Sequence, residues 1–323
     1  MRVLVTGGAG YIGSHLADAL IKRGDEVLVI DNLSTGRFEN IRHLQGHPGF
    51  RFINDTILNE SLLERMIPSR DLVFHLAAAV GVRNVLKDPL AAINTNVRGT
   101  EAVLDHAFRY WKRIVIASTS EIYGKASHVP FREDDDRVLG STAVTRWSYS
   151  MSKAIDEHFA FAYAAKGLPV SIVRYFNSYG PRIDERGYGS VVANFARQAL
   201  RGDPITVHGD GNQSRCFTFI SDTVAGTLLA GEADGAIGEA FNIGNPSETT
   251  VLELAKTMKR LARSKSAIQF VPYEAYYGTG FEDTRRRVPA VDKAKRLLGF
   301  TPKVRLEAGL AKTLAWCRAH YRH

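Results

Sequence analysis

One short stretch decides the fold, and it reads Thr6-Gly7-Gly8-Ala9-Gly10-Tyr11-Ile12-Gly13. It joins an apolar run at Arg2–Thr6, predicted to be a strand, to a run at Tyr11–Lys22 that is predicted to be a helix. Glycines permit a tight turn and let the backbone approach a ligand, while the first turn of a helix offers unpaired N–H groups to an anion. The stretch therefore predicts a pyrophosphate-binding turn at the start of an α/β sheet.

An acidic residue follows at the spacing that this turn requires. Asp31 ends the next apolar run, Glu26–Asp31, and lies 18 residues beyond Gly13. A carboxylate there accepts hydrogen bonds from the adenosine ribose of a dinucleotide and repels a 2′-phosphate, so we expect NAD rather than NADP. The residues expected to bind it are Gly7, Gly10, Tyr11, Ile12, Gly13, Asp31 and Asn32.

The rest of the first half alternates short apolar runs with longer helical ones. Further strands are predicted at Phe50–Asn54, Asp71–Leu76, Arg113–Ser118 and Val170–Tyr175, and long helices at Pro89–Trp111 and Ser148–Lys166. Strands that alternate with helices predict a doubly wound parallel sheet, the Rossmann type of α/β fold.

The alternation ends after Phe176, which predicts a second, smaller part of the chain. We expect an NAD-binding Rossmann domain at residues 1–176 and a mixed α/β substrate lobe at residues 177–323, with the chain crossing between them. Helices are predicted in or near the lobe at Ser190–Arg201, Asp222–Gly231, Val251–Leu261 and Leu306–Tyr321.

Composition narrows the class of protein. The chain has 323 residues, a formal charge of +8 and two cysteines, Cys216 and Cys317, which cannot form a disulfide framework and favour a reducing compartment. No leader sequence, membrane-length apolar run or metal-ligand spacing is evident, so we expect a cytoplasmic protein without membrane contact or metal. The excess of basic residues favours the binding of anionic small molecules over nucleic acid, because motifs for binding nucleic acid are lacking.

A tyrosine and a lysine predict the catalytic chemistry. Tyr149 and Lys153 lie four residues apart on a predicted helix and therefore share one face. A fixed ammonium favours the phenolate, which would make Tyr149 a general base. The run Ser118–Gly124 ends the fifth predicted strand, at the sheet edge where α/β ligands bind, and supplies a hydroxyl for the same substrate oxygen.

These motifs together resemble the extended short-chain dehydrogenase/reductases, a family of nucleotide-sugar epimerases, dehydratases and decarboxylases. The resemblance continues through His75–Ala78, Arg174–Asn177, Gly180–Arg182 and Gly209–Gly211, and covers nearly the whole chain. It implies that Tyr149 takes the proton of the sugar 4-hydroxyl while NAD takes hydride from carbon 4. It also implies cofactor contacts from Asp55, Leu76, Ala77, Ala78, Tyr149 and Lys153, and contacts to a UDP-sugar from Ser120, Asn177, Arg182 and Arg215.

The residues after Ser118 bear on which reaction follows. Thr119-Ser120-Glu121 has serine where glucose 4,6-dehydratases carry an acid, and it resembles UDP-glucuronate decarboxylases and mannose-type 4,6-dehydratases. Residues 146–150, the segment Tyr276–Asp283 and the run Arg285-Arg286-Arg287 resemble the decarboxylase of bacterial lipid A modification. That likeness implies that Arg287 grips the substrate carboxylate, with Arg286 near a phosphate and Glu121 handling a proton or the carboxylate.

The leading hypothesis is therefore NAD-dependent decarboxylation of UDP-glucuronate, through a 4-keto intermediate, to UDP-xylose or a UDP-4-keto-pentose. A 4-epimerase acting on UDP-glucuronate or UDP-glucose, or a 4,6-dehydratase, stays open. A non-catalytic regulator that binds NAD or RNA is the remote alternative. The family resemblance also implies a homodimer formed through the helices predicted at Pro89–Trp111 and Ser148–Lys166.

Overall fold

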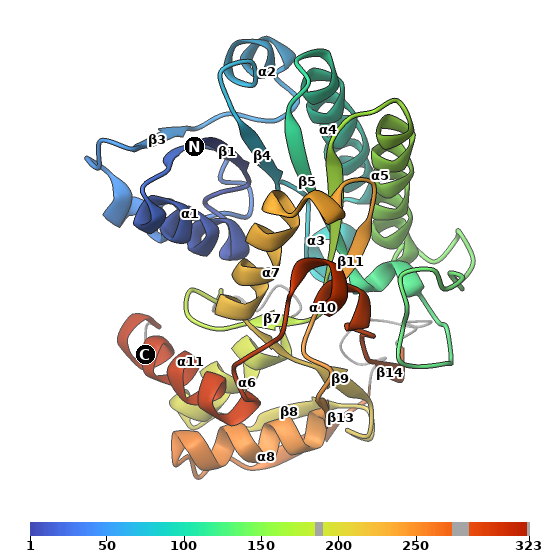
Figure 1. Ribbon diagram of the computed structural model, residues 1–323. Coiled ribbons are helices and arrows are strands. Elements are labelled where there is room, and N and C mark those ends of the chain that lie inside the picture. Colours follow the sequence, from blue (N-terminus) through green and yellow to red (C-terminus); the bar gives the residue numbers. More distant parts are fainter. Residues whose placement is uncertain (185–189, 273–283, 322–323) are drawn as a thin grey trace.

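A computed structural model describes residues 1–184, 190–272 and 284–321. Its centre is a parallel sheet of seven strands in the order β11-β6-β5-β4-β1-β2-β3, which confirms the Rossmann-type α/β prediction (Figure 1). The strands are β1 (Arg2–Thr6), β2 (Glu26–Ile30), β3 (Phe50–Ile53), β4 (Leu72–His75), β5 (Arg113–Thr119), β6 (Val170–Tyr175) and β11 (Ala240–Ile243).

Helices cover both faces of this sheet because alternate strand residues point to opposite sides. Val3 and Val5 of β1 pack with α1 (Tyr11–Arg23) and α7 (Ile220–Glu232), whereas Leu4 packs on the opposite face. The helices of that second face include α2 (Glu60–Met66), α4 (Pro89–Arg109) and α5 (Trp147–Ala165). Short segments α3 (Val82–Lys87), η1 (Phe38–Asn40), η2 (Arg42–Leu44) and η3 (Ser120–Tyr123) complete this part.

The remaining elements form a smaller mixed α/β lobe below the sheet in Figure 1, where α6, α8 and α11 lie together. Its helices are α6 (Val191–Arg201), α8 (Val251–Ala262) and α11 (Leu306–His320). By contrast, α10 (Asp292–Leu298) contacts β11 of the main sheet, and η4 (Asp234–Ala236) packs against α7 and α10. Small sheets join β7 (Ser178–Tyr179) to β10 (Thr218–Phe219) and β8 (Ile205–His208) to β13 (Ile268–Val271). A third small sheet contains, in this order, β12 (Glu248–Thr250), β9 (Ser214–Cys216) and β14 (Arg286–Arg287).

The two parts are interlaced. β11 comes late in the sequence, yet it pairs with β6 and forms the edge of the main sheet. A cut at residue 176 would therefore remove one of the seven strands, and the predicted domain boundary stays a prediction. Among the described helices, none combines the length and the apolar character needed to cross a membrane.

Candidate active site

A cavity of about 1280 Å³ runs between the sheet and the smaller lobe. The strand order reverses between β1 and β4, and parallel sheets bind ligands outside the carboxyl ends of their strands at such a point. The cavity is lined by the segments that follow β1, β2, β4 and β5, and by residues of the smaller lobe. Pockets for one small ligand are usually about 300–1,000 Å³, so this cavity can hold two ligands together.

The glycine turn forms one wall of the cavity, and its shape leaves no room for side chains. Gly7 has φ of 73°, and a Cβ on it would lie 2.6 Å from the backbone nitrogen of Ala77. A Cβ on Gly13 would lie 2.2 Å from the Gly7 carbonyl oxygen. Gly10 precedes the first turn of α1, so free N–H groups face the cavity at that helix end. The turn therefore fits a dinucleotide pyrophosphate.

Asp31 closes the far side of this turn. Its carboxylate accepts hydrogen bonds from the backbone N–H of Ala9, at 2.9 Å, and of Leu33, at 2.8 Å. Burial raises the pKa of Asp31, although these N–H donors oppose the shift by stabilising the charged form. The carboxylate both locks the glycine turn and lines the cavity where an adenosine ribose would lie.

The other predicted cofactor residues lie along the same wall. Asn32, Asp55 and the segment Leu76–Ala78 all line the cavity. Asp55 is held in place by Asn59, whose amide donates to its carboxylate at 2.8 Å. Arg37 also lines this part and forms an ion pair with Asp184 at 3.1 Å, a contact between distant segments that the sequence motif gave no reason to expect.

Tyr149 lies in the first turns of α5, directly beside the end of β5. A hydrogen bond with the Thr119 side chain lowers its pKa, but burial, followed by the Glu121 carboxylate, outweighs this and raises that pKa well above its usual value. In the structure the phenol is therefore protonated at neutral pH. A bound positive charge would be needed to make it a base.

Lys153 lies one helical turn after Tyr149, as the spacing predicts, but its ammonium pairs with Asp156 instead. The Lys153 Nζ atom lies 2.6 Å from Asp156 Oδ2, and both side chains are almost fully buried. We expected Lys153 to lower the pKa of Tyr149, but it is not among the groups that shift this pKa. Asp156 was not among the predicted site residues, because a carboxylate three positions after a lysine is also common on exposed helices.

Glu121 and Arg287 are 166 residues apart in the sequence but meet at the cavity wall. The Arg287 guanidinium lies 3.5 Å from Glu121 Oε1. Strand β14 pairs with β9 so that Arg287 stands beside Arg215, and both arginines line the cavity. Neighbouring strand residues point to opposite faces, which explains why Arg286 behaves differently from Arg287.

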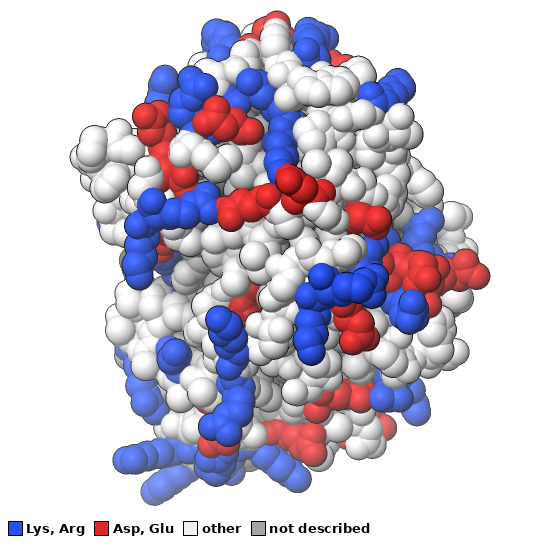
Figure 2. All heavy atoms as spheres, in the orientation of Figure 1, with Lys and Arg blue, Asp and Glu red and all other residues white. Residues whose placement is uncertain are grey.

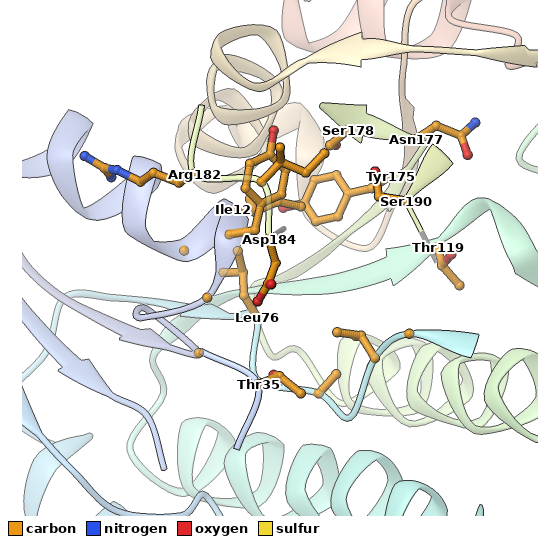
Figure 3. Close-up of a pocket in the computed structure, with 18 of the residues that line it drawn as sticks. Ile12, Thr35, Leu76, Thr119, Tyr175, Asn177, Ser178, Arg182, Asp184 and Ser190 are labelled. Atoms are coloured by element: carbon orange, nitrogen blue, oxygen red, sulfur yellow. The ribbon is translucent and has the colours of Figure 1, made fainter. Parts of the chain in front are cut away.

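Arg286 lies away from the cavity. Its guanidinium donates to both carboxylate oxygens of Glu248, and its side chain is 55% exposed, against 8% for Arg287. Arg182 lines the cavity but points towards α1, where it pairs with Asp18 at 2.6 Å. In Figure 3 it extends to the side opposite Thr119 and Asn177. The structure therefore does not bring these two arginines together with Arg287.

The other predicted substrate residues do line the cavity. Ser120 is buried beneath it, and Asn177 is held by a hydrogen bond from its amide to the Cys216 carbonyl at 3.0 Å. Arg146 also lines the cavity and is buried beside the Trp147 ring, although its motif pointed only to a family likeness. The segment Tyr276–Asp283 lies outside the described residues.

Comparison with known proteins agrees with this architecture. Residues 4–313 match the family model described as GDP-mannose 4,6 dehydratase. A UDP-N-acetyl-alpha-D-glucosaminuronate decarboxylase of Bacillus cytotoxicus is 43% identical over 98% of both chains. UDP-glucuronic acid decarboxylase 1 of Danio rerio is 39% identical over all of this chain and 74% of its own length.

A solved structure gives the same result for the fold. The UDP-glucuronic acid 4-epimerase of Bacillus cereus, determined in complex with UDP-glucuronic acid and NAD, superposes with a TM-score of 0.89. It is 31% identical, with 99% of this chain and all of that chain covered. The chain therefore belongs to the GDP-mannose 4,6-dehydratase family, within the NAD-dependent epimerases and dehydratases of the short-chain dehydrogenase/reductase type.

Proposed function

We propose that the protein decarboxylates UDP-glucuronate, with NAD, to UDP-xylose or a UDP-4-keto-pentose. The observation that carries this proposal is the pair of Glu121 and Arg287, which faces the cavity that Tyr149 and Thr119 also line. An epimerase or dehydratase acting on a neutral sugar has no need of a buried guanidinium for a carboxylate. Similarity to two sugar-acid decarboxylases over at least 98% of this chain supports the same choice.

The residues of the glycine turn, with Asp31 and Asp55, would hold NAD. When bound, this cofactor supplies a reversible hydride acceptor for carbon 4 of the sugar. Asn177 and Arg215 line the part of the cavity nearer the smaller lobe, and they would contact the UDP diphosphate. This division leaves the sugar between Tyr149 and Arg287.

Tyr149 would take the proton from the sugar 4-hydroxyl, and Thr119 would orient that oxygen through its own hydroxyl. The Tyr149 pKa is raised by burial, so the charge of the bound nicotinamide and of Lys153 must offset the desolvation of the phenolate. After oxidation at carbon 4, the protonated phenol is the hydrogen-bond donor for the new ketone oxygen.

Loss of carbon dioxide then follows from the position of the ketone. The carboxylate carbon is β to it, so the electrons of the breaking bond move onto the ketone oxygen as an enolate, and carbon 5 takes up a proton. Arg287 would hold the carboxylate through its planar fork of donors. Glu121, whose side chain is 20% exposed, would turn the carboxylate out of the ring plane or supply the proton.

Incubation with UDP-glucuronate and NAD tests the proposal. The expected products are carbon dioxide and a UDP-pentose, identified by mass spectrometry. Formation of UDP-galacturonate without gas release would instead make the protein a 4-epimerase. A second substrate, UDP-N-acetylglucosaminuronate, is favoured by the name of the Bacillus cytotoxicus relative, and the ratio of kcat/KM for the two sugars decides between them.

A protein that binds RNA in place of a sugar would release no carbon dioxide from either substrate. On the face shown in Figure 2, acidic and basic side chains are interspersed over much of the surface, and basic ones gather at the lower end near α8. Part of that charge is compensated, since Arg260 of α8 pairs with Glu307 at 2.9 Å. Tight, salt-sensitive RNA binding without sugar turnover would overturn the proposal.

We also propose a cytoplasmic homodimer. Cys216 and Cys317 are both buried thiols, which suits a reducing compartment. Exposed apolar side chains lie on α4 and α5, which pack side by side; they are Leu90, Ile93, Met151, Ile155 and Phe161. Such a face is the kind that dimers bury. Sedimentation of the wild type as a dimer, and of an Ile155→Glu variant as a monomer, is the expected result; a wild-type monomer would refute it.

A further inference from the structure

An ion pair is buried one helical turn beyond the proposed base. Lys153 Nζ and Asp156 Oδ2 are 2.6 Å apart, with side chains 3% and 0% exposed. Burying two charges is costly unless they are paired, and removing one partner leaves the other uncompensated. The charge state of Lys153 therefore depends on Asp156, and Asp156 lies where no substrate or cofactor atom would touch it, outside the cavity lining.

The other polar groups near this pair have partners of their own. His75 of β4 contacts the hydroxyls of Thr6 and Thr100 through its two ring nitrogens, at 2.8 and 3.0 Å. Burial, with Lys153 as the second cause, lowers the pKa of His75 to about 3, so this ring is neutral at working pH. Burial raises the pKa of Asp156, while Lys153 and then the Thr100 hydroxyl of α4 oppose that shift by stabilising the ionised form.

The neighbouring carboxylates are committed elsewhere or face the cavity. Glu157, next to Asp156 on α5, is bonded by the guanidinium of Arg174 from β6 and by the hydroxyl of Ser118 from β5. Glu121 of η3 lies beside Arg287. Asp156 is therefore the carboxylate that balances the buried lysine, and its negative charge also raises the pKa of Tyr149.

We propose that Asp156 is a positioning residue of the active site: it keeps Lys153 an ammonium inside the protein and thereby sets the pH range over which Tyr149 works. This inference rests on the proposed function. Asp156 acts in two ways, because it stabilises the lysine charge and disfavours the phenolate. Without its charge, the Tyr149 phenolate would be less disfavoured, and the Lys153 ammonium would be left without its buried counter-charge.

The variant Asp156→Asn removes the charge and keeps the shape of the side chain. We expect both limbs of the pH profile of kcat to move to lower pH, so that the optimum itself shifts. The alkaline limb should move by about one to three pH units, the usual effect of a close opposite charge, and the acid limb by less, because Tyr149 is farther from Asp156. KM for the UDP-sugar should change little.

Two further variants separate charge from structure. Asp156→Glu keeps the carboxylate, so the limbs should return towards those of the wild type even if kcat is reduced. Glu157→Gln changes the adjacent buried carboxylate, which pairs with Arg174 rather than with the lysine; it should lower thermal stability and leave the limbs in place. If Asp156→Asn reduces kcat equally at every pH, or if Glu157→Gln moves the limbs as much, Asp156 is only structural and the inference is wrong.

A second measurement stands apart from turnover. NMR of the holoenzyme with labelled lysine side chains reports the titration of Lys153 directly. A lower Lys153 pKa in Asp156→Asn supports the inference, and an unchanged one overturns it. If neither UDP-hexuronate is consumed by the wild type, the proposed function fails, while this titration still decides the role of Asp156.

Discussion

Replacing Arg287 with alanine gives the sharpest test of substrate choice. The guanidinium is 8% exposed and lies 3.5 Å from the Glu121 carboxylate. It lines the cavity that we propose for the UDP-sugar, where a substrate carboxylate would meet it. A hydrogen bond to a charged group contributes about 1.5–3 kcal/mol, so Arg287→Ala should lower kcat/KM for UDP-glucuronate roughly 10- to 150-fold.

The chain supplies its own matched control. Arg286→Ala removes an identical side chain from the adjacent position, where it is 55% exposed and pairs with Glu248. We expect that variant to keep kcat/KM within about a factor of two, because surface ion pairs contribute little. Arg287→Lys should recover part of the loss, since an ammonium keeps the charge without the fork of donors.

The assay measures carbon dioxide release from UDP-glucuronate and, separately, the Kd of the neutral analogue UDP-glucose by calorimetry. Arg287→Ala should leave the UDP-glucose Kd almost unchanged. Equal weakening for both sugars, or an equal loss in Arg286→Ala, would refute the carboxylate contact. Thermal denaturation of each variant excludes a general loss of structure.

Three other predictions concern the base, the acid and the buried histidine. Tyr149→Phe should lower kcat by at least about 10²-fold, the usual contribution of a general base, while calorimetry shows NAD binding unchanged; full activity would end the role of the phenol. Glu121→Gln should slow carbon dioxide release more than hydride transfer, which single-turnover absorbance of the reduced cofactor follows, and equal slowing would argue against a separate role. His75 stays neutral in the folded chain, with a pKa of about 3 against 6.5 when unfolded, so its unfolded form binds the extra proton and stability falls as pH drops from 6.5 towards 3. Urea unfolding should show that the free energy of unfolding falls by at most about 1.4 kcal/mol per pH unit because of this group. His75→Gln should reduce the slope of that free energy against pH, and an unchanged slope contradicts the assignment.

The cofactor half of the molecule was predictable because its signals are local. Each strand from β1 to β6 is rich in apolar residues, and the glycine turn needs only its own backbone to define a binding surface. The predicted strands and helices differ from the observed ones by at most two residues at either end, as at Phe50–Asn54 against β3. Strand β11 gave no such signal, since a run of only four residues does not indicate which sheet it joins.

The candidate site was less predictable where it depends on distant partners. Arg286 and Arg287 are equivalent in sequence, and only the pairing of β14 with β9 determines which one faces the cavity. Arg182 is predicted at the substrate and does line the cavity, but the sequence gives no sign that its guanidinium pairs with Asp18 of α1. The pairing of Asp156 with Lys153 was recognised only from the burial of both side chains in the structure. Helical spacing alone cannot tell a solvated ion pair from a buried one.

The return of β11 to the main sheet has a consequence for biosynthesis. As the chain leaves the ribosome, β6 has no partner on its outer edge until Ala240–Ile243 has been made. The whole segment between β6 and β11 must be synthesised before these two strands can pair. An exposed edge strand is a template for association with other chains. A fragment of residues 1–176 lacks β11, so the outer edge of β6 would stay exposed. We expect this fragment to precipitate unless a peptide that contains β11 is supplied in trans.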